Sequence, residues 1–175
     1  MEASHFVLAS FLWWIWCFLR RHVRAASGRP RYNVLGALNA ATHESIAEIN
    51  TTYIDAGSVG ALLRKIAGRG VPIPITLVMD NARDQRCVSV QDTAKGLGIG
   101  RRFWPSDSPN PTLIERLWKF VKKEVLNSRY HQDFKKFREA IDGCLAEMPT
   151  KHQAKLAALL TRNFQTWDNM SPLNA

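Results

Sequence analysis

The order of apolar and polar positions predicts strands in the first part of the chain. The uncharged stretch from Phe6 to Leu19 is rich in aromatic and β-branched residues, which favours two adjacent buried strands with a turn near Ala9 and Ser10. A third strand is expected over Arg31 to Asn39, after a turn-like segment that contains glycine and proline. The pattern therefore places three successive strands at the start of the chain.

Helix and strand patterns alternate in the middle of the chain. Apolar residues recur at helical spacing over Ser58 to Gly68, and the serine that opens this segment is a candidate N-cap. A continuous apolar run from Pro74 to Asp80 predicts a strand that is buried on both faces and ends in a carboxylate. A helix over Gln85 to Leu97 and a short strand over Gly98 to Trp104 are expected next.

The last third of the chain is predicted to be helical after a proline-rich loop over residues 105–111. A long amphipathic helix begins at Thr112, which forms a capping-box pair with Glu115. Two shorter amphipathic helices are expected over Phe134 to Leu145 and Lys151 to Leu160.

Taken in order, these elements predict an α/β domain. Three antiparallel strands followed by alternating helix and strand are typical of a ribonuclease H-like fold, a mixed sheet with helices on both faces. The length of 175 residues suits one ordinary domain. We expect this domain to cover residues 1–165 and a C-terminal tail to cover residues 166–175.

Composition supports a folded, basic protein. The 24 Lys and Arg residues against 15 Asp and Glu give a net charge of +9, and 46% of the residues are hydrophobic. This hydrophobic fraction excludes disorder for most of the chain, and the positive charge predicts nucleic acid or an anionic surface as partner. Three scattered cysteines, Cys17, Cys87 and Cys144, support neither a disulfide framework nor a zinc site, which is typical of a cytoplasmic protein.

The stretch from Phe6 to Leu19 also admits a membrane or export interpretation, although the sequence favours the two-strand interpretation over it. The stretch is shorter than the ~20 apolar residues of a spanning helix. A signal peptide carries positive charge before its apolar stretch, whereas this chain has Glu2 there. We therefore expect no membrane partner.

Two carboxylates and their neighbours suggest chemistry. Asp80 ends the predicted buried strand, and Glu115 lies in the first turn of the long helix, with Lys119 and Lys122 on the same exposed face. Hard divalent ions take oxygen ligands, so carboxylates bordered by positive charge suit metal-assisted phosphodiester chemistry. The residues alone leave a structural alternative open, in which Glu115 is a capping residue, Asp80 forms a turn and the lysines are solvated.

Two longer segments resemble a known family. Residues 75–82 (ITLVMDNA) and 105–120 (PSDSPNPTLIERLWKF) closely resemble the catalytic core of bacterial insertion-sequence transposases of the mariner-related DDE superfamily. The similarity also runs through residues 31–39, 51–54, 130–140 and 164–166. The resemblance implies a ribonuclease H-like fold, two Mg²⁺ or Mn²⁺ ions, cleavage at transposon ends and strand transfer by the freed 3′-hydroxyl.

The resemblance also implies roles for individual residues. Asp80 is similar to the second acidic residue of the family's triad and Glu115 to the third, while Glu2 stands where the family has an aspartate. These three would be catalytic and hold the metal ions, and Asn81 would orient Asp80. The residues expected to bind DNA are Arg116, Lys119, Lys122 and Lys123. Double-stranded DNA, both transposon end and target, is the expected partner, with a homodimer on DNA as one form of the assembly and the nucleoid as its location.

The beginning of the chain departs from the family pattern. Glu2 adds a methylene to the expected aspartate, which shifts the carboxylate by about a bond length. The helix-turn-helix region that family members carry upstream is also missing from this sequence. Two hypotheses follow: an active transposase catalytic domain, or a truncated, catalytically impaired transposase remnant that binds DNA nonspecifically.

Overall fold

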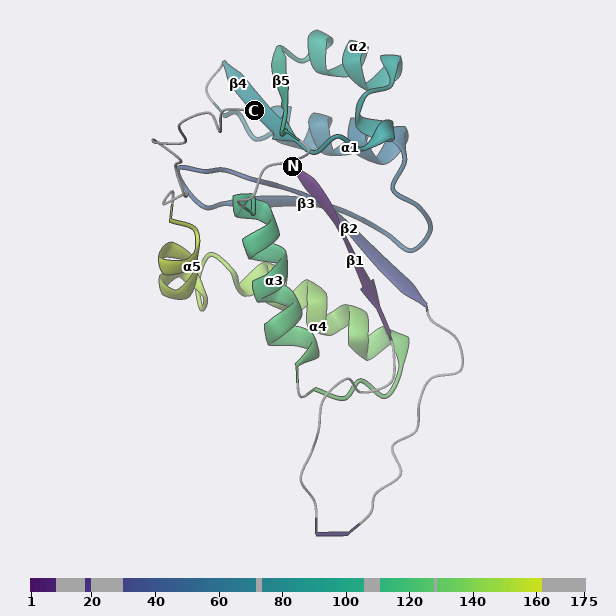
Figure 1. Ribbon diagram of the computed structural model, residues 1–175, viewed down its shortest axis with the longest axis vertical. Helices are drawn as coiled ribbons and strands as arrows, with labels where there is room; N and C mark the ends of the chain where they lie inside the picture. Colours follow the sequence, from purple (N-terminus) through teal and green to yellow (C-terminus); the bar gives the residue numbers. More distant parts are fainter. Residues whose placement is uncertain (9–17, 20–29, 72–73, 106–110, 128, 162–175) are drawn as a thin grey trace, which may run out of the picture.

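The computed structural model describes residues 1–8, 18–19, 30–71, 74–105, 111–127 and 129–161. The described residues form two sheets and five α-helices, and helices lie on both sides of the first sheet (Figure 1). The first sheet is antiparallel in the order β1-β2-β3, with β1 at Glu2–Val7, β2 at Arg31–Leu38 and β3 at Ser45–Asn50. The second sheet pairs β4, Ile75–Met79, with β5, Ile99–Phe103, in parallel.

Helices cover both faces of the first sheet, which confirms the predicted α/β class. On one side, α1 (Ala56–Ala67) packs on β2 and β3, and α2 (Val88–Gly96) packs on α1 and β5. On the other side, α3 (Leu113–Leu126) crosses β1 and β2 and is supported by α4 (Phe134–Glu147) and α5 (Gln153–Leu159) (Figure 1). None of the helices in the described part of the chain is long and apolar enough to cross a membrane.

Two hydrophobic clusters follow from this arrangement. The cluster under α3 includes Phe6, Val34 and Trp118, with the Phe6 and Trp118 rings meeting edge to face at 6.5 Å. The cluster under α1 and α2 includes Leu35 and Met79. Val34 and Leu35 are neighbours on β2 that point to opposite faces, so one central strand serves both clusters.

The predicted long helix is confirmed. Thr112 is its N-cap, and the apolar stripe is buried as expected from its spacing; the stripe consists of Ile114, Leu117, Trp118, Val121 and Val125. The predicted helix over residues 85–97 is shorter, because a separate 3-10 turn at Arg83–Gln85 precedes α2. The N-cap of α1 is Asp55, and Ser58 is instead the third residue of that helix.

The membership of the first sheet differs from the sequence prediction. The opening strand is Glu2–Val7, and the second strand expected within Phe6 to Leu19 falls mostly on residues 9–17, which lie outside the described residues. Phe18 and Leu19 are exposed, so the prediction that they are buried is wrong. The strand predicted over Arg31 to Asn39 is confirmed as β2. Strand β3, Ser45–Asn50, was missed because every one of its residues is half-buried and no alternation marks it.

The prediction that β4 is buried on both faces is also wrong. Leu77 and Met79 are buried against the cluster under α1 and α2. Thr76 and Val78 point the other way, and Val78 is 43% exposed. In a two-stranded sheet covered by helices on one side, the other face stays accessible, even where it carries an apolar residue such as Val78.

Candidate active site

Strand β1 places Glu2 beside the start of α3. Glu2 lies opposite Gly36 in the register of β1 and β2. A side chain at position 36 would not fit, because a Cβ there would lie 2.5 Å from Cζ2 of Trp118. The helix therefore packs directly on the backbone of β2, and its first turn reaches the Glu2 side chain.

Thr112 links the strand and the helix through one hydroxyl group. Its Oγ1 accepts a hydrogen bond from the backbone N–H of Glu115 at 3.2 Å, which is the Thr112 half of the expected capping box. The same hydroxyl donates to Oε2 of Glu2 at 3.3 Å. Sequence reasoning found the cap and missed this second bond, because no local pattern connects residues 110 positions apart.

Asp80 reaches the same region from the second sheet. It follows β4, and its Oδ1 accepts a hydrogen bond from the backbone N–H of Ala82 at 3.2 Å. The main-chain nitrogen of Met1 donates to the carbonyl oxygen of Val78 at 2.5 Å, so the start of β1 lies against the end of β4. Glu2 and Asp80 are thereby brought to adjacent strand ends.

The pKa of Glu2 depends on its burial and on the neighbouring carboxylates. Burial and the negative charges of Glu115 and Asp80 outweigh the opposing hydrogen bond from Thr112 and raise the pKa of Glu2 to about 7; burial is the largest cause. At neutral pH the carboxyl group is therefore divided between its protonated and ionised forms. Glu2 is a carboxylate that its surroundings destabilise when it is charged.

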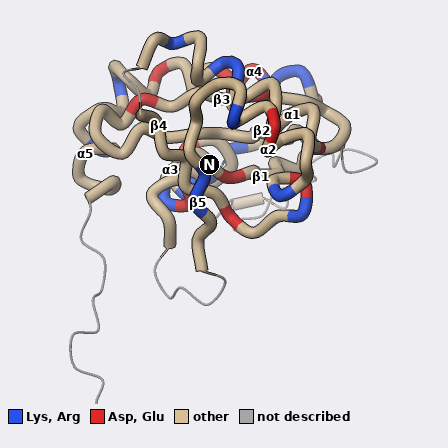
Figure 2. The backbone as a smooth tube through the Cα atoms, turned by 90° about the horizontal axis from the view of Figure 1, so that it is seen from above, with Lys and Arg blue, Asp and Glu red and all other residues tan. Residues whose placement is uncertain are grey.

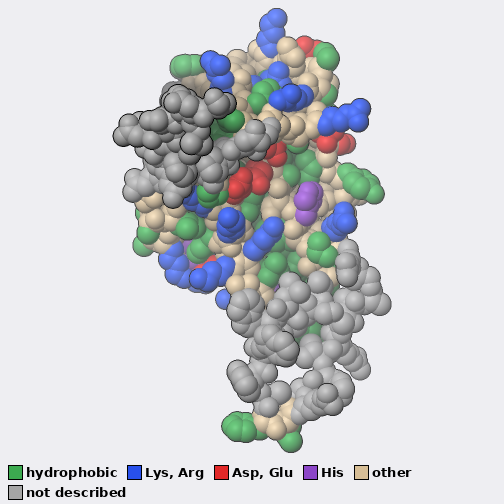
Figure 3. Space-filling view, viewed as in Figure 1, with side chains coloured by type: hydrophobic (Ala, Val, Ile, Leu, Met, Phe, Trp, Pro, Cys, Tyr) green, Lys and Arg blue, Asp and Glu red, His purple; other side chains and the backbone are tan. Residues whose placement is uncertain are grey.

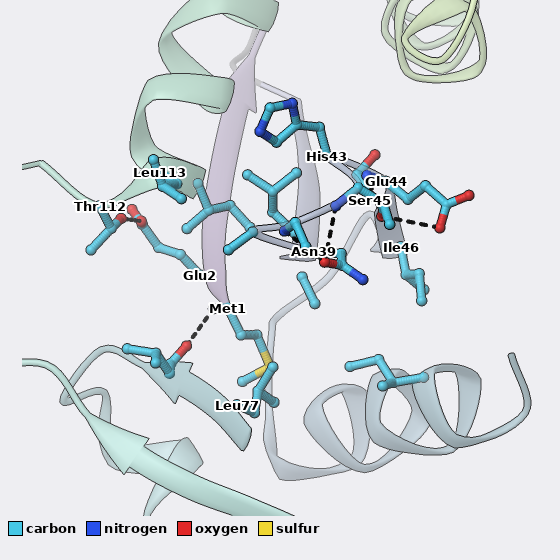
Figure 4. Close-up of a pocket in the computed structure, with 18 of the residues that line it drawn as sticks. Met1, Glu2, Asn39, His43, Glu44, Ser45, Ile46, Leu77, Thr112 and Leu113 are labelled. Carbon is cyan, nitrogen blue, oxygen red and sulfur yellow. Dashed lines mark hydrogen bonds between the residues drawn. The ribbon is translucent and has the colours of Figure 1, made fainter. Parts of the chain in front are cut away.

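One open cleft of about 1280 Å³ contains all three carboxylates in its lining. Figure 4 shows Glu2 and Thr112 joined on its wall, with Met1 and Leu77 beside them. Figure 3 shows acidic side chains in the middle of this face, with Lys and Arg side chains above and below them. The cleft therefore combines half-buried carboxylates with surrounding basic side chains.

The carboxylates of the cleft do not form a closed ligand set. Among the residues that the structure describes, no group of three or more His, Cys, Asp or Glu side chains lies close enough to hold a metal ion. The donor chemistry nevertheless fits a hard divalent ion, since carboxylate oxygens are its preferred ligands. A cation in the cleft would also relieve the repulsion that helps to raise the pKa of Glu2.

Asn81 joins the ends of the two parallel strands. Its Nδ2 donates to the carbonyl oxygen of Trp104 at 2.8 Å, and its Oδ1 accepts a hydrogen bond from Nη2 of Arg86. These contacts fix the backbone that carries Asp80, which is the means by which Asn81 would orient that residue. Sequence reasoning did not find the contribution of Arg86 and Trp104, because neither belongs to a recognisable pattern.

The four basic residues predicted to bind DNA differ in their surroundings. Lys119 and Lys123 are exposed on α3. Lys122 is half-buried, with Nζ 5.6 Å from the centre of the Phe6 ring, and Arg116 donates to the carbonyl oxygen of Thr161 at 3.0 Å. Lys119 and Lys123 are therefore the more accessible to a phosphate group, while Lys122 and Arg116 also stabilise the fold.

Comparison with known proteins gives one family and one fold. A family model described as DDE superfamily endonuclease matches residues 19–138, which include Asp80 and Glu115 and begin after Glu2. No curated protein matches the sequence. A chain in the cryo-EM structure of the simian T-cell lymphotropic virus intasome in complex with PP2A regulatory subunit B56 gamma is similar, with a TM-score of 0.53 and 17% identity. The match covers 84% of this chain and 46% of that one, so this chain spans less than half of its structural relative, and the shared fold is ribonuclease H-like.

Proposed function

The chain belongs to the DDE superfamily endonucleases, and from this premise we propose that it is a transposase catalytic domain. It would cut double-stranded DNA at transposon ends and join the freed 3′-hydroxyl to target DNA. The observation that carries this proposal is that Glu2, Asp80 and Glu115, from a strand, a strand end and a helix start, line one cleft. The raised pKa of Glu2, caused first by burial and then by the negative charges of Glu115 and Asp80, supports it.

Glu2, Asp80 and Glu115 would hold two Mg²⁺ or Mn²⁺ ions. A bound divalent ion lowers the pKa of an attacking water or 3′-hydroxyl and stabilises the leaving oxygen. Thr112 holds one oxygen of Glu2 in place, and the first turn of α3 fixes the backbone of Glu115. The role of these contacts is to keep the ligands in a constant position, on which the rate of such chemistry depends strongly.

The basic side chains of α3 would position the DNA. Lys119 lies one helical turn beyond Glu115, and Lys123 lies one turn beyond Lys119, so they extend the line that starts at the carboxylate. A duplex held by these lysines would present its backbone to the cleft. Each phosphate contact of this kind adds affinity that falls with increasing salt.

A second candidate is a catalytically impaired domain that binds DNA nonspecifically. The observation that favours it is Glu2 itself, which is longer than aspartate, bonded to Thr112 and partly protonated at neutral pH. A protonated carboxyl group is a poor metal ligand. In this case the lysines of α3 would still bind DNA, while cutting would be weak.

A nicking assay separates the two candidates. A labelled duplex is incubated in Mn²⁺ with the wild-type chain, the Glu2→Asp variant and the Asp80→Asn variant. Wild-type cutting that disappears in Asp80→Asn supports an active transposase domain, and cutting that needs Glu2→Asp supports the impaired domain. Failure of both the wild type and Glu2→Asp to cut, or cutting that survives Asp80→Asn, would contradict the site assignment.

A further inference from the structure

A second group of basic side chains lies outside the cleft lining, near the end of β4, where Arg86 bonds to Asn81. The guanidinium carbon of Arg86 lies 4.9 Å from the centre of the Phe103 ring, and that of Arg101 lies 5.8 Å from it. Arg86 is exposed and Arg101 is half-buried. We call Arg86 and Arg101 the arginine pair. Figure 2 shows the basic positions of β5 close to the marked N-terminus, which is the start of β1.

The arginine pair is tied to the end of the strand that carries Asp80. Met79 pairs with Phe103 in the parallel register, and the N–H of Trp104 donates to the carbonyl oxygen of Met79 at 2.7 Å. Because the carboxyl ends of parallel strands meet at one edge, Phe103 and Asp80 lie at the same edge of this sheet. Nη2 of Arg86 also bonds to Asn81, the residue that follows Asp80.

The pair is held in place without being neutralised. Nη1 of Arg101 donates to the carbonyl oxygen of Gln85 at 3.1 Å, and Arg86 donates to a neutral amide. Within the described residues, ion pairs to carboxylates engage lysines and His152, and none engages Arg86 or Arg101. A guanidinium group has five N–H donors, so each arginine keeps donors beyond this hydrogen bond. Stacking on an aromatic ring reduces the entropy lost when such a group binds a ligand.

We propose that the arginine pair is a phosphate-binding site for duplex DNA on the β5 side of the cleft. Together with Lys119 and Lys123 on α3, it would hold the sugar-phosphate backbone on both sides of the carboxylates. Planar guanidinium groups suit this ligand, because they match two phosphate oxygens at once. The inference rests on the proposed function and adds to it the path of the DNA. The duplex is either the end that is cut or the target that is joined, which share this chemistry.

The test is the salt dependence of duplex binding by the full chain. Arg86→Gln/Arg101→Gln should lower the slope of log K against log salt by about 1.8, since each phosphate contact contributes about 0.9. The matched control, Lys135→Gln/Lys136→Gln, removes two charges from the start of α4, which lies at the opposite end of the molecule from β5 (Figure 1), and should leave the slope unchanged. Arg86→Lys/Arg101→Lys keeps both charges and should retain most of the slope, which separates loss of charge from loss of folding.

The outcomes distinguish this inference from the proposed function. If the wild type binds duplex DNA and the Arg86→Gln/Arg101→Gln variant has the same slope of log K against log salt, the arginine pair is not a phosphate-binding site. The transposase proposal would still stand. Wild-type binding without salt dependence would overturn both. If the slope falls, nicking and joining assays identify the duplex: loss of both activities assigns the pair to the cut end, and loss of joining alone assigns it to the target.

Discussion

Helices α1 and α3 begin in the same way but serve different purposes. In each, a side-chain oxygen of the N-cap accepts the N–H of the third helical residue, Asp55 from Ser58 at 2.8 Å and Thr112 from Glu115 at 3.2 Å. At α1 the hydroxyl of Ser58 accepts the backbone N–H of Asp55 at 3.5 Å, so the capping box is complete, and the same hydroxyl donates to Oδ1 of Asp55 at 2.9 Å. At α3 the cap hydroxyl donates instead to Glu2, on a different element.

The pKa values express the same difference. Hydrogen bonds from Ser58 lower the pKa of Asp55, so the fold stabilises that carboxylate as an anion. Burial and two other carboxylates raise the pKa of Glu2, so the fold disfavours that anion. A helix start that satisfies its own charges needs no ligand, whereas one that gathers unsatisfied charges is suited to bind a cation. Similar N-caps can therefore begin a helix whose charges are satisfied locally and a helix that lies beside unsatisfied carboxylates.

The largest expected effect is on nicking activity, which should depend on the carboxylate at the start of α3 and not on the one at the start of α1. Glu115→Gln should reduce Mn²⁺-dependent nicking at least about 100-fold, because it removes a proposed metal ligand. The melting temperature should be unchanged or higher, since one of the charges that repel Glu2 is gone. Asp55→Asn is the matched carboxylate-to-amide change at α1 and should leave nicking unchanged. Equal nicking by Glu115→Gln and the wild type would contradict the proposed role of Glu115 as a metal ligand.

The next effect tests whether α3 owes its position to Gly36. Gly36→Ala should lower the free energy of unfolding by about 1–3 kcal/mol, because the new Cβ would meet the ring of Trp118 at 2.5 Å. Urea denaturation measures this change. Nicking should fall in the same variant, since the helix start moves relative to Glu2. Gly143, where a Cβ meets nothing within 4 Å, is the matched site at which alanine should be tolerated.

A third test uses pH and concerns Glu2 in metal-free protein. Its pKa is about 7 in the fold against 4.5 ordinarily, so the folded state keeps this proton to higher pH than the unfolded state does. The contribution of Glu2 to stability is therefore complete below about pH 4.5 and is lost as pH rises towards 7. Glu2→Gln should melt higher than the wild type at pH 8 in EDTA and lose this advantage at pH 4. If the melting temperatures of the two proteins differ by the same amount at every pH, the proposed destabilisation of the ionised Glu2 is absent.

The smallest expected effect lies at α1. Asp55→Ala should lower the urea midpoint slightly with an unchanged m value, because the cap is exposed and serves only the helix end. Nicking should keep its wild-type rate. Loss of nicking without loss of folded protein would mean that α1 also communicates with the cleft.

Local patterns predicted those parts of the molecule that local forces determine. The stripe of α3 follows from the spacing of residues such as Leu117 and Trp118, and the apolar run of β4 locates Asp80 at a strand end. β3 escaped prediction because it is held by backbone pairing with β2, and its half-buried residues give no periodic signal.

The sequence nominated the members of the candidate site but not the contacts that hold them. The resemblance supplied Glu2, Asp80 and Glu115, and all three line the cleft. The bond from Thr112 to Glu2 depends on how tightly α3 packs over Gly36, a property of the assembled core that no stretch of sequence contains. Burial on one face of β4 likewise depends on how many strands and helices surround it.

The separation of Glu2 and Thr112 by 110 positions also has a consequence in time. A ribosome adds roughly 5–20 residues per second, so Glu115 enters the chain about 5–20 s after Glu2. During that interval the nascent protein has a first carboxylate with no helix to hold it. The proposed capacity to cut DNA would therefore arise only after α3 has been synthesised, and a translation product that ends before α3 would lack Glu115.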